Sequence, residues 1–282
     1  MSSAVSPLVT VDWLADHLTA PDVKVLDGSW YLPQMERDAE REFLEAHIPG
    51  AAFLDLDKIS DSDNPFPHML PTPEKFSSHM KQLGIGDGHH VIVYDGAGLF
   101  SAARFWWMFK TMGHDNVSVL DGGLPKWIAA GQRTDAGSSS NSARHHTARP
   151  NNTIRRNIED MKRNLETRRE QVVDARSQGR FAGTDPEPRP ALSSGHIPGS
   201  LSLPFVELLN EDGTLKALPE LTRIFESAGV NLAQPIVTIC GSGVTAAIPY
   251  LALSVLGHSK IALYDGSWSE WAATDGAPIE KD

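Results

Sequence analysis

The sequence predicts an α/β protein made of two tandem copies of one domain, each a mostly parallel sheet with helices on both faces. Two observations predict this fold class. Short apolar runs rich in β-branched residues alternate with longer helical patterns, and the second half of the chain repeats the first. Alternating strands and helices favour a parallel sheet that is covered on both sides. The 282 residues suffice for two domains that each bury a core.

The internal repeat is read from motifs that recur at a nearly constant spacing of 144 to 149 residues. The matched pairs are HIPGA with HIPGS (47–51 and 196–200), VLDGS with VVDAR (25–29 and 172–176), and LDGGLPKW with YDGSWSEW (120–127 and 264–271). The same alignment sets Asp95 of the first copy opposite Cys240 of the second. Regular repetition of this kind indicates a duplicated structural unit.

Each copy contains the apolar runs that the fold requires. The expected strands lie at 23–27, 91–95, 117–121, 171–175, 236–240 and 260–265. The patterns at 100–113 and 244–257 are long enough for crossover helices, and Pro249 falls in the first turn of the second, where proline is tolerated. A charged, amphipathic helix is expected at 157–170.

The boundary between the copies is expected at 131–152, a stretch rich in Gly, Ser, Asn and Arg without an apolar period. Such a composition is typical of a solvated linker. The first domain then spans 1–130 and the second domain spans 153–282. The histidine pairs at 89–90 and 145–146 are interpreted as solvated, because no metal-ligand spacing accompanies them.

Composition excludes several classes of partner. The net charge of -11 disfavours nucleic acid and anionic membranes, and no run of about eighteen apolar residues predicts a membrane span. The N-terminus shows neither a basic segment nor an apolar stretch of the kind found in signal peptides. A single cysteine cannot close an intramolecular disulfide, so we expect a reducing, cytoplasmic location.

Cys240 is the main candidate for chemistry. It ends an apolar strand, and the loop GSGVT leads directly from it into a helix. Ligands of parallel sheets bind beyond the carboxyl ends of strands, where glycines allow amides to converge and a helix N-terminus favours negative charge. These features favour a thiolate, the nucleophilic form of cysteine. The competing interpretation is that Cys240 is a small buried apolar residue, the usual role of a lone cysteine.

Several motifs together resemble the tandem-domain sulfurtransferases of the rhodanese superfamily, in particular those that use 3-mercaptopyruvate. The motifs are HIPG in each copy, CGSGVTA at 240–246, GRFAGTDPEPR at 179–189, SWYLP at 29–33, FLDLDKISD at 53–61 and PHMLP at 67–71. The resemblance covers nearly the whole chain and is weak only in the linker. It implies two rhodanese-like domains, of which only the second is catalytic.

The resemblance also implies which residues bind the substrate. Arg180 and Arg189 would hold the carboxylate and keto group, a task that suits planar guanidinium groups. The loop residues Gly241, Gly243, Val244 and Thr245 would line the site. By sequence alone the two arginines could instead be solvated surface residues. The first-copy stretch at 30–46 shows no counterpart of either arginine motif.

A proton relay is implied by the same resemblance. Ser242 would act with His68 and Asp57, which would reach across from the first domain, to protonate the departing enolate. His68 and Asp57 break the internal symmetry of the sequence, whereas His47 and His196 keep it and are expected to be structural.

The expected reaction carries sulfur on Cys240. The thiolate takes the sulfur of 3-mercaptopyruvate as a persulfide, pyruvate leaves, and a thiol (thioredoxin, by the resemblance) or cyanide accepts the sulfur. No metal or organic cofactor is required. Thiosulfate is the nearest alternative donor, although its users carry basic residues where this chain has Gly241 and Ser242.

Two further alternatives belong to other functional classes. A cysteine phosphatase would need an arginine six residues after the cysteine, and Ala246 occupies that position. A non-enzymatic interaction module would have no need to keep the glycine-rich loop.

Overall fold

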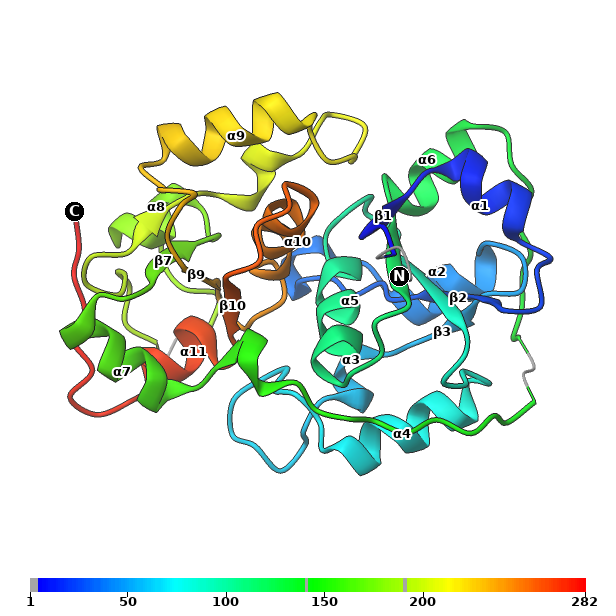
Figure 1. Cartoon of the computed structure of the whole chain (residues 1–282), viewed down its shortest axis with the longest axis horizontal. Coiled ribbons are helices and arrows are strands. Elements are labelled where there is room, and N and C mark those ends of the chain that lie inside the picture. Colours follow the sequence, from blue (N-terminus) through cyan, green and yellow to red (C-terminus); the bar gives the residue numbers. More distant parts are fainter. Residues whose placement is uncertain (1–4, 140–141, 190–191) are drawn as a thin grey trace. The chain divides into compact units, whose positions relative to one another are not determined.

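Two five-stranded parallel sheets form the framework of the computed structural model, which describes residues 5–139, 142–189 and 192–282 (Figure 1). The chain folds into two compact units, one around each sheet. Unit 1 comprises Met1–Ser62, Pro71–Asn151 and Leu209–Leu215, and unit 2 comprises Asp63–Leu70, Asn152–Leu208 and Lys216–Asp282. Each unit therefore contains one short segment from the opposite half of the chain.

The two sheets have the same strand order. In unit 1 the order is β1 (Leu8–Val9), β5 (Val117–Leu120), β4 (His90–Tyr94), β2 (Val23–Asp27) and β3 (Ala52–Phe53). In unit 2 it is β6 (Arg155–Arg156), β10 (Ile261–Tyr264), β9 (Ile236–Ile239), β7 (Gln171–Asp174) and β8 (Leu201–Ser202). Every paired strand runs parallel, which confirms the predicted fold class.

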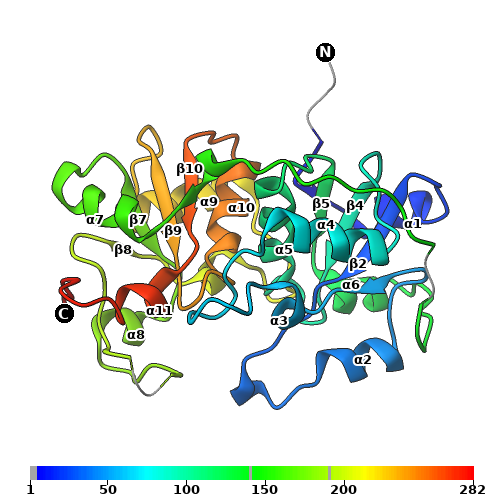
Figure 2. The same cartoon turned by 90° about the horizontal axis from the view of Figure 1, so that it is seen from below.

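The helices follow the strands in both units (Figures 1 and 2). Unit 1 contains α1 (Val11–His17), η1 (Pro33–Met35), α2 (Ala39–Glu45), α3 (Leu56–Ile59), α4 (Pro73–Gln82), α5 (Ala102–Thr111) and α6 (Gly123–Ala129). Unit 2 contains η2 (Asn152–Ile154), α7 (Ile158–Thr167), α8 (Gln178–Ala182), η3 (Phe205–Leu208), α9 (Leu218–Ser227), α10 (Ala247–Val255) and α11 (Ser267–Trp271).

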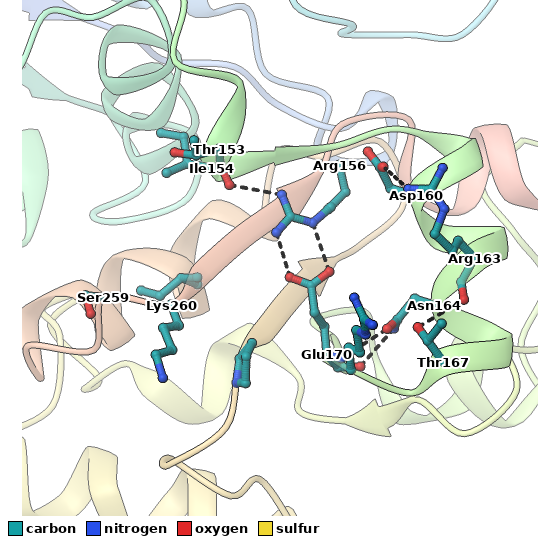
Figure 3. A pocket seen from close by; sticks show the side chains of 13 residues that line it. Thr153, Ile154, Arg156, Asp160, Arg163, Asn164, Thr167, Glu170, Ser259 and Lys260 are labelled. Carbon is teal, nitrogen blue, oxygen red and sulfur yellow. Dashed lines mark hydrogen bonds and ion pairs between the residues drawn. The ribbon is translucent and has the colours of Figure 1, made fainter.

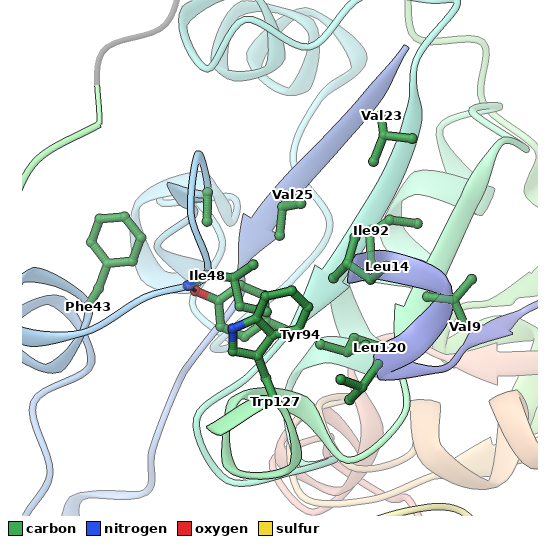
Figure 4. Packing of buried hydrophobic residues seen from close by; sticks show 12 residues of the cluster. Val9, Leu14, Val23, Val25, Phe43, Ile48, Ile92, Tyr94, Leu120 and Trp127 are labelled. Carbon is green, nitrogen blue, oxygen red and sulfur yellow. Dashed lines mark hydrogen bonds between the residues drawn. The ribbon is translucent and has the colours of Figure 1, made fainter. Parts of the chain in front are cut away.

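The core of unit 1 lies on both faces of its sheet. On one face Leu14 of α1 and Trp127 of α6 belong to the same buried cluster as Tyr94 of β4 (Figure 4). On α5, Phe109 packs edge-on against Phe76 of α4, with ring centroids 5.2 Å apart. Full burial of side chains of this size stabilises the fold by about 1.5–3 kcal/mol each.

Unit 2 is built on the same plan. Met161 of α7 and Trp268 of α11 pack with Tyr264 of β10, while α10 contacts β9 and β10. Pro249 is the third residue of α10, within the first turn as predicted, where its missing N–H costs no intrahelical hydrogen bond.

The exchanged segments are held by equivalent bonds. The amide of Leu70 donates to Asp265 Oδ2 in unit 2 at 3.0 Å, and the amide of Leu215 donates to Asp121 Oδ1 in unit 1 at 2.8 Å. Asp121 and Asp265 occupy matching positions directly after β5 and β10. The same carboxylate in each copy therefore anchors a segment from the other half of the chain.

Within the expected linker, residues 142–151 are mostly exposed, but their backbone is hydrogen-bonded to unit 1; residues 140–141 lie outside the described part. The amide of Arg149 donates to the carbonyl of Met112, and that of Thr147 donates to Asp87 Oδ1. His146 is only 6% exposed, with its ring against Phe76. Backbone pairing of this kind needs no apolar period, so the composition carries no sign of it.

Candidate functional site

Cys240 directly follows β9, at the carboxyl edge of the unit 2 sheet, and is 2% exposed. Its amide donates to Ser267 Oγ at 3.2 Å, and its carbonyl accepts from the amide of Trp268 at 2.9 Å. Ser267 adopts a positive φ of 49°, a strained conformation for a residue other than glycine. The first residues of α11 thus hold the backbone of Cys240 in place through two hydrogen bonds.

The loop after Cys240 turns sharply into α10. Gly243 has a φ of 77°, in the left-handed region that glycine adopts without strain. The amides of Ser242, Thr245 and Ala246 have no protein acceptor within residues 5–139, 142–189 and 192–282. Together with the N-terminus of α10, these donors can stabilise an anion at the cysteine.

Ser242 and His68 form a hydrogen-bonded pair. Ser242 Oγ lies 2.8 Å from His68 Nδ1, and both side chains are buried. His68 comes from the first half of the chain, as expected, but it belongs to unit 2 through the exchanged segment that Leu70 anchors. A hydroxyl bonded to an imidazole can pass a proton in either direction.

Asp57 is the one predicted site residue that belongs to unit 1. It lies in α3, and Nε1 of Trp30 donates to its Oδ2 at 3.3 Å. Its participation in the proton relay stays a prediction.

Arg180, in the short helix α8, lies against the cysteine loop. A Cβ atom built on Gly241 would stand 2.9 Å from Nη2 of Arg180, so glycine at 241 leaves room for the guanidinium. Nη2 of Arg180 donates to Glu187 Oε2 at 2.6 Å and Nε donates to Oε1 at 3.3 Å. The side chain is 20% exposed, so this arginine is not simply a solvated surface residue.

Sequence reasoning missed the buried ion-pair network behind Arg180. Nη1 of Arg176 donates to Glu187 Oε1 at 2.7 Å, and its other nitrogens bind both oxygens of Asp174 and the carbonyl of Gly195. Burial acts to lower the pKa of Arg176, but the carboxylates of Asp174 and Glu187 raise it above its ordinary value. The sequence signal that could have indicated this network is Arg176 two residues after Asp174, the last residue of an apolar strand.

Arg189 reaches the same loop through a serine. Nη1 of Arg189 lies 3.5 Å from Ser269 Oγ, at the limit of a hydrogen bond. The hydroxyl and the amide of Ser269 both donate to the carbonyl of Gly241, at 2.6 and 2.9 Å. The structure therefore brings both predicted arginines to the loop that carries Cys240.

The first copy lacks the arginine motifs in sequence, as expected, but it has an arginine–glutamate pair beside the matching loop. In unit 1, Nε and Nη2 of Arg37 donate to the two carboxylate oxygens of Glu42 at 2.9 and 2.6 Å, and Nη2 also donates to the carbonyl of Gly96. Gly96 matches Gly241 in the repeat. The pairs are five and seven residues apart in sequence, so no aligned motif exposes the correspondence.

The histidines that the repeat preserves have structural partners. His47 Nδ1 bonds to the carbonyl of Phe43 and His196 Nδ1 bonds to that of Phe181, with each ring stacked on the same phenylalanine. This confirms their interpretation as structural residues. In the described part of the chain, no three His, Cys, Asp or Glu side chains gather closely enough to hold a metal ion.

Unit 2 also contains a cavity of about 480 Å³ whose lining does not include Cys240. Figure 3 shows the residues that line it. Pro235 and Ile261, which border it, stand at the amino ends of β9 and β10, whereas Cys240 follows the carboxyl end of β9. Its most buried cation, Arg156, is already bound bidentately by Glu170. This cavity therefore takes no part in chemistry at Cys240.

None of the helices that the structure describes is both long and apolar enough to pass through a lipid bilayer.

Comparison with known proteins agrees with the repeat. A family model described as "Rhodanese-like domain" matches twice, at residues 10–130 and 157–274. The 3-mercaptopyruvate sulfurtransferase of Homo sapiens is 45% identical over 94% of this chain and 91% of its own. A protein of Arabidopsis thaliana named thiosulfate/3-mercaptopyruvate sulfurtransferase 1, mitochondrial, is 42% identical over 99% of this chain and 79% of its own.

A solved structure shows the same architecture. The crystal structure of SseA from Escherichia coli, reported as showing the "Rhodanese" fold of 3-mercaptopyruvate sulfotransferases, superimposes on this chain with a TM-score of 0.86. The two chains are 40% identical, and the match covers 94% of this chain and 99% of the other.

Proposed function

The chain belongs to the rhodanese family, with two rhodanese-like domains in tandem, and on this premise we propose that it transfers the sulfur of 3-mercaptopyruvate through a Cys240 persulfide. The observation that carries the proposal is the surrounding of Cys240. A thiol stands at the carboxyl end of a strand, in a loop of uncharged residues with Arg180 against Gly241. The amides of Ser242, Thr245 and Ala246 have no protein acceptor in the described ranges.

The first step forms the persulfide. The thiolate of Cys240 attacks the sulfur of 3-mercaptopyruvate, an S–S bond forms and the C–S bond breaks. The electron pair of the broken bond stays on carbon as the enolate of pyruvate. Arg180 and Arg189 hold the carboxylate and the keto oxygen, which concentrates positive charge where the enolate develops.

Protonation of the enolate completes the release of pyruvate. The 2.8 Å hydrogen bond between Ser242 and His68 supports Ser242 as the proton donor, with His68 returning a proton to the hydroxyl. Asp57 remains a proposed third member of this relay, on the resemblance alone.

The second step passes the outer sulfur to an acceptor. The amides of Ser242, Thr245 and Ala246, together with the α10 N-terminus, stabilise the anionic forms of Cys240 before and after loading. A thiolate or cyanide then attacks the outer sulfur and releases the Cys240 thiolate. We propose a protein thiol such as thioredoxin as acceptor and a reducing, cytoplasmic location, in keeping with a role in cysteine catabolism.

Thiosulfate is the second candidate donor, because two relatives from Arabidopsis thaliana are named for both donors. The uncharged Gly241 and Ser242 favour a monocarboxylate over a dianion at the cysteine. Steady-state kinetics with each donor decides between them. The larger kcat/KM is expected for 3-mercaptopyruvate.

Intact-mass spectrometry tests the proposal directly. After exposure to 3-mercaptopyruvate, the protein should gain the mass of one sulfur atom and lose it on treatment with a dithiol. The Cys240→Ser variant should gain nothing. A wild-type protein that takes up sulfur from neither donor would refute the enzyme and favour an interaction module.

A further inference from the structure

Four charged side chains of alternating sign run from the sheet of unit 2 to the cysteine loop. They are, in order, Asp174, Arg176, Glu187 and Arg180. The successive contacts are 2.6 Å from Asp174 to Arg176, 2.7 Å from Arg176 to Glu187 and 2.6 Å from Glu187 to Arg180. The arginine that meets the loop is therefore the last member of a continuous row of ion pairs.

Burial distinguishes the end of this row from its interior. The side chains of Asp174 and Arg176 are 0% exposed and that of Glu187 is 2% exposed, whereas that of Arg180 is 20% exposed. Buried charges persist only when each is paired, and Glu187 is paired on both sides. Its carboxylate cannot turn away from Arg180 without leaving a charge unpaired, so its direction is fixed.

Glu187 determines which edge of Arg180 remains available. It occupies Nε and Nη2, the side edge of the guanidinium. Nη1 has no acceptor within the described ranges of the chain. A guanidinium offers five donors in one plane, so its outer edge can still bind a carboxylate in two contacts.

In the first copy, an outer nitrogen of the corresponding arginine is already bound to the loop. There Arg37 grips Glu42 in the same way, but its Nη2 also donates to the loop carbonyl of Gly96. Pro125 stands at the α6 position that matches Ser269, and proline has no amide hydrogen to give that carbonyl. In the second copy Ser269 supplies both donors to Gly241, so Arg180 is not needed there.

From these contacts we propose that Glu187 is a positioning residue, which holds Arg180 with its outer edge toward the carboxylate of the sulfur donor beside Cys240. The inference rests on the proposed function, because it assigns Arg180 to substrate binding. Glu187 itself touches neither substrate nor sulfur. It acts by fixing the guanidinium before the substrate arrives, which lowers the cost of ordering on binding.

The test is Glu187→Gln in the full chain, compared with Glu42→Gln in the matching pair of unit 1. Loss of an interaction that is equally strong in the ground state and the transition state raises KM and leaves kcat unchanged. In Glu187→Gln the KM for 3-mercaptopyruvate should rise about tenfold or more, because a hydrogen bond to a charged group contributes enough binding energy for such a change. The kcat should change little, and Glu42→Gln should leave KM unaltered.

A second readout separates positioning from general damage. Protein loaded at saturating 3-mercaptopyruvate and then mixed with dithiothreitol should lose its sulfur at the wild-type rate in Glu187→Gln. Arg180→Lys and the double variant Arg180→Lys/Glu187→Gln should have the same KM, because the partners act as one unit. Additive effects, an unchanged KM, or equally slowed loading and discharge would overturn the inference.

Should Glu187→Gln fail to fold, Glu187→Asp keeps the charge but is too short to reach both arginines. It should raise KM about threefold or more with kcat retained, and an unchanged KM there overturns the inference. The proposed function fails separately, when the wild-type protein forms no persulfide at Cys240.

Discussion

The loops that follow β4 and β9 are the same structure with different centres. In unit 1 the carboxylate of Asp95 accepts four amide hydrogens, from Ala97, Phe100, Ser101 and Ala102, at 2.8 to 2.9 Å. In unit 2 the centre is Cys240, and the matching amides of Ser242, Thr245 and Ala246 have no protein acceptor in the described ranges. The fold builds an anion cradle twice, and in the first copy an aspartate fills it.

The arginines beside the two loops repeat this contrast. Arg37 is closed onto the carbonyl of Gly96, while Ser269 satisfies the corresponding carbonyl of Gly241 and spares Arg180. In the first copy the loop donors are thus bound by an aspartate, and Arg37 is bound to a loop carbonyl. In the second copy the matching loop amides and Nη1 of Arg180 have no acceptor in the described ranges. Comparison within one chain distinguishes what the fold requires from what the chemistry requires.

Cys240→Asp should convert the second loop into a replica of the first. Sulfur transfer should disappear completely, and the melting temperature should rise above that of Cys240→Ser, because charge-assisted bonds to the loop amides form. Thermal melts and turnover assays of both variants check this. A Cys240→Asp protein less stable than Cys240→Ser would show that the two cradles are not equivalent.

Asp95→Asn should destabilise unit 1, because an amide side chain offers the four backbone donors a neutral acceptor in place of a carboxylate. The expected loss in the free energy of unfolding is about 2–4 kcal/mol. Urea denaturation measures it, with the exposed Asp16→Asn as control. A loss no greater than that of the control would mean that the carboxylate does not hold the loop.

Gly241→Ala and Gly96→Ala should separate function from stability. The new Cβ at 241 would stand 2.9 Å from Nη2 of Arg180, so the end of this side chain must shift from the position that Glu187 gives it. KM should therefore rise roughly three- to tenfold at little cost in stability. At 96 the new Cβ meets the Tyr31 hydroxyl closely, so stability should fall by about 1–3 kcal/mol with KM unchanged. Equal effects on KM would contradict the division of roles.

The segment 142–151 follows the first copy alone, and it gives unit 1 an acid-sensitive histidine. Burial lowers the pKa of His146 from 6.5 to about 4, with the nearby His114 adding to the effect. Between about pH 6.5 and 4, His146 is therefore protonated in the unfolded chain but neutral in the folded chain. The free energy of unfolding decreases as the pH falls through this range. The loss approaches about 3 kcal/mol at the lower end.

His146→Leu should remove this dependence, measured as the free energy of unfolding at pH 7 and pH 4.5. Asp27, whose pKa burial raises to about 6, contributes the opposite slope over part of the same range. Both proteins carry Asp27, so their difference isolates His146. Parallel pH profiles of the two proteins would exclude His146 as the source.

Features with a local pattern could be predicted from the sequence. The six longest strands, the helix after Cys240 and the duplication are confirmed, because strand and helix periods and repeated motifs are written in consecutive residues. The two-residue strands β1, β3, β6 and β8 were missed, since two residues carry no period.

The candidate site was only partly predictable for the same reason. Cys240 could be identified from its loop, and the arginines from the resemblance. Glu187 and Arg176 form pairs that depend on the folded chain, and no alignment showed that Arg37 corresponds to Arg180. Nor did any pattern show that the segment carrying His68 belongs to unit 2, because a single backbone bond to Asp265 leaves no periodic trace.

The exchanged segments also make each half of the chain depend on residues of the other half. A fragment that begins at the second copy would lack His68, so Ser242 would lose its imidazole and Asp265 the amide of Leu70. A fragment of the first copy alone would leave Asp121 without Leu215. Cutting the chain between the two copies would therefore remove hydrogen bonds from both units.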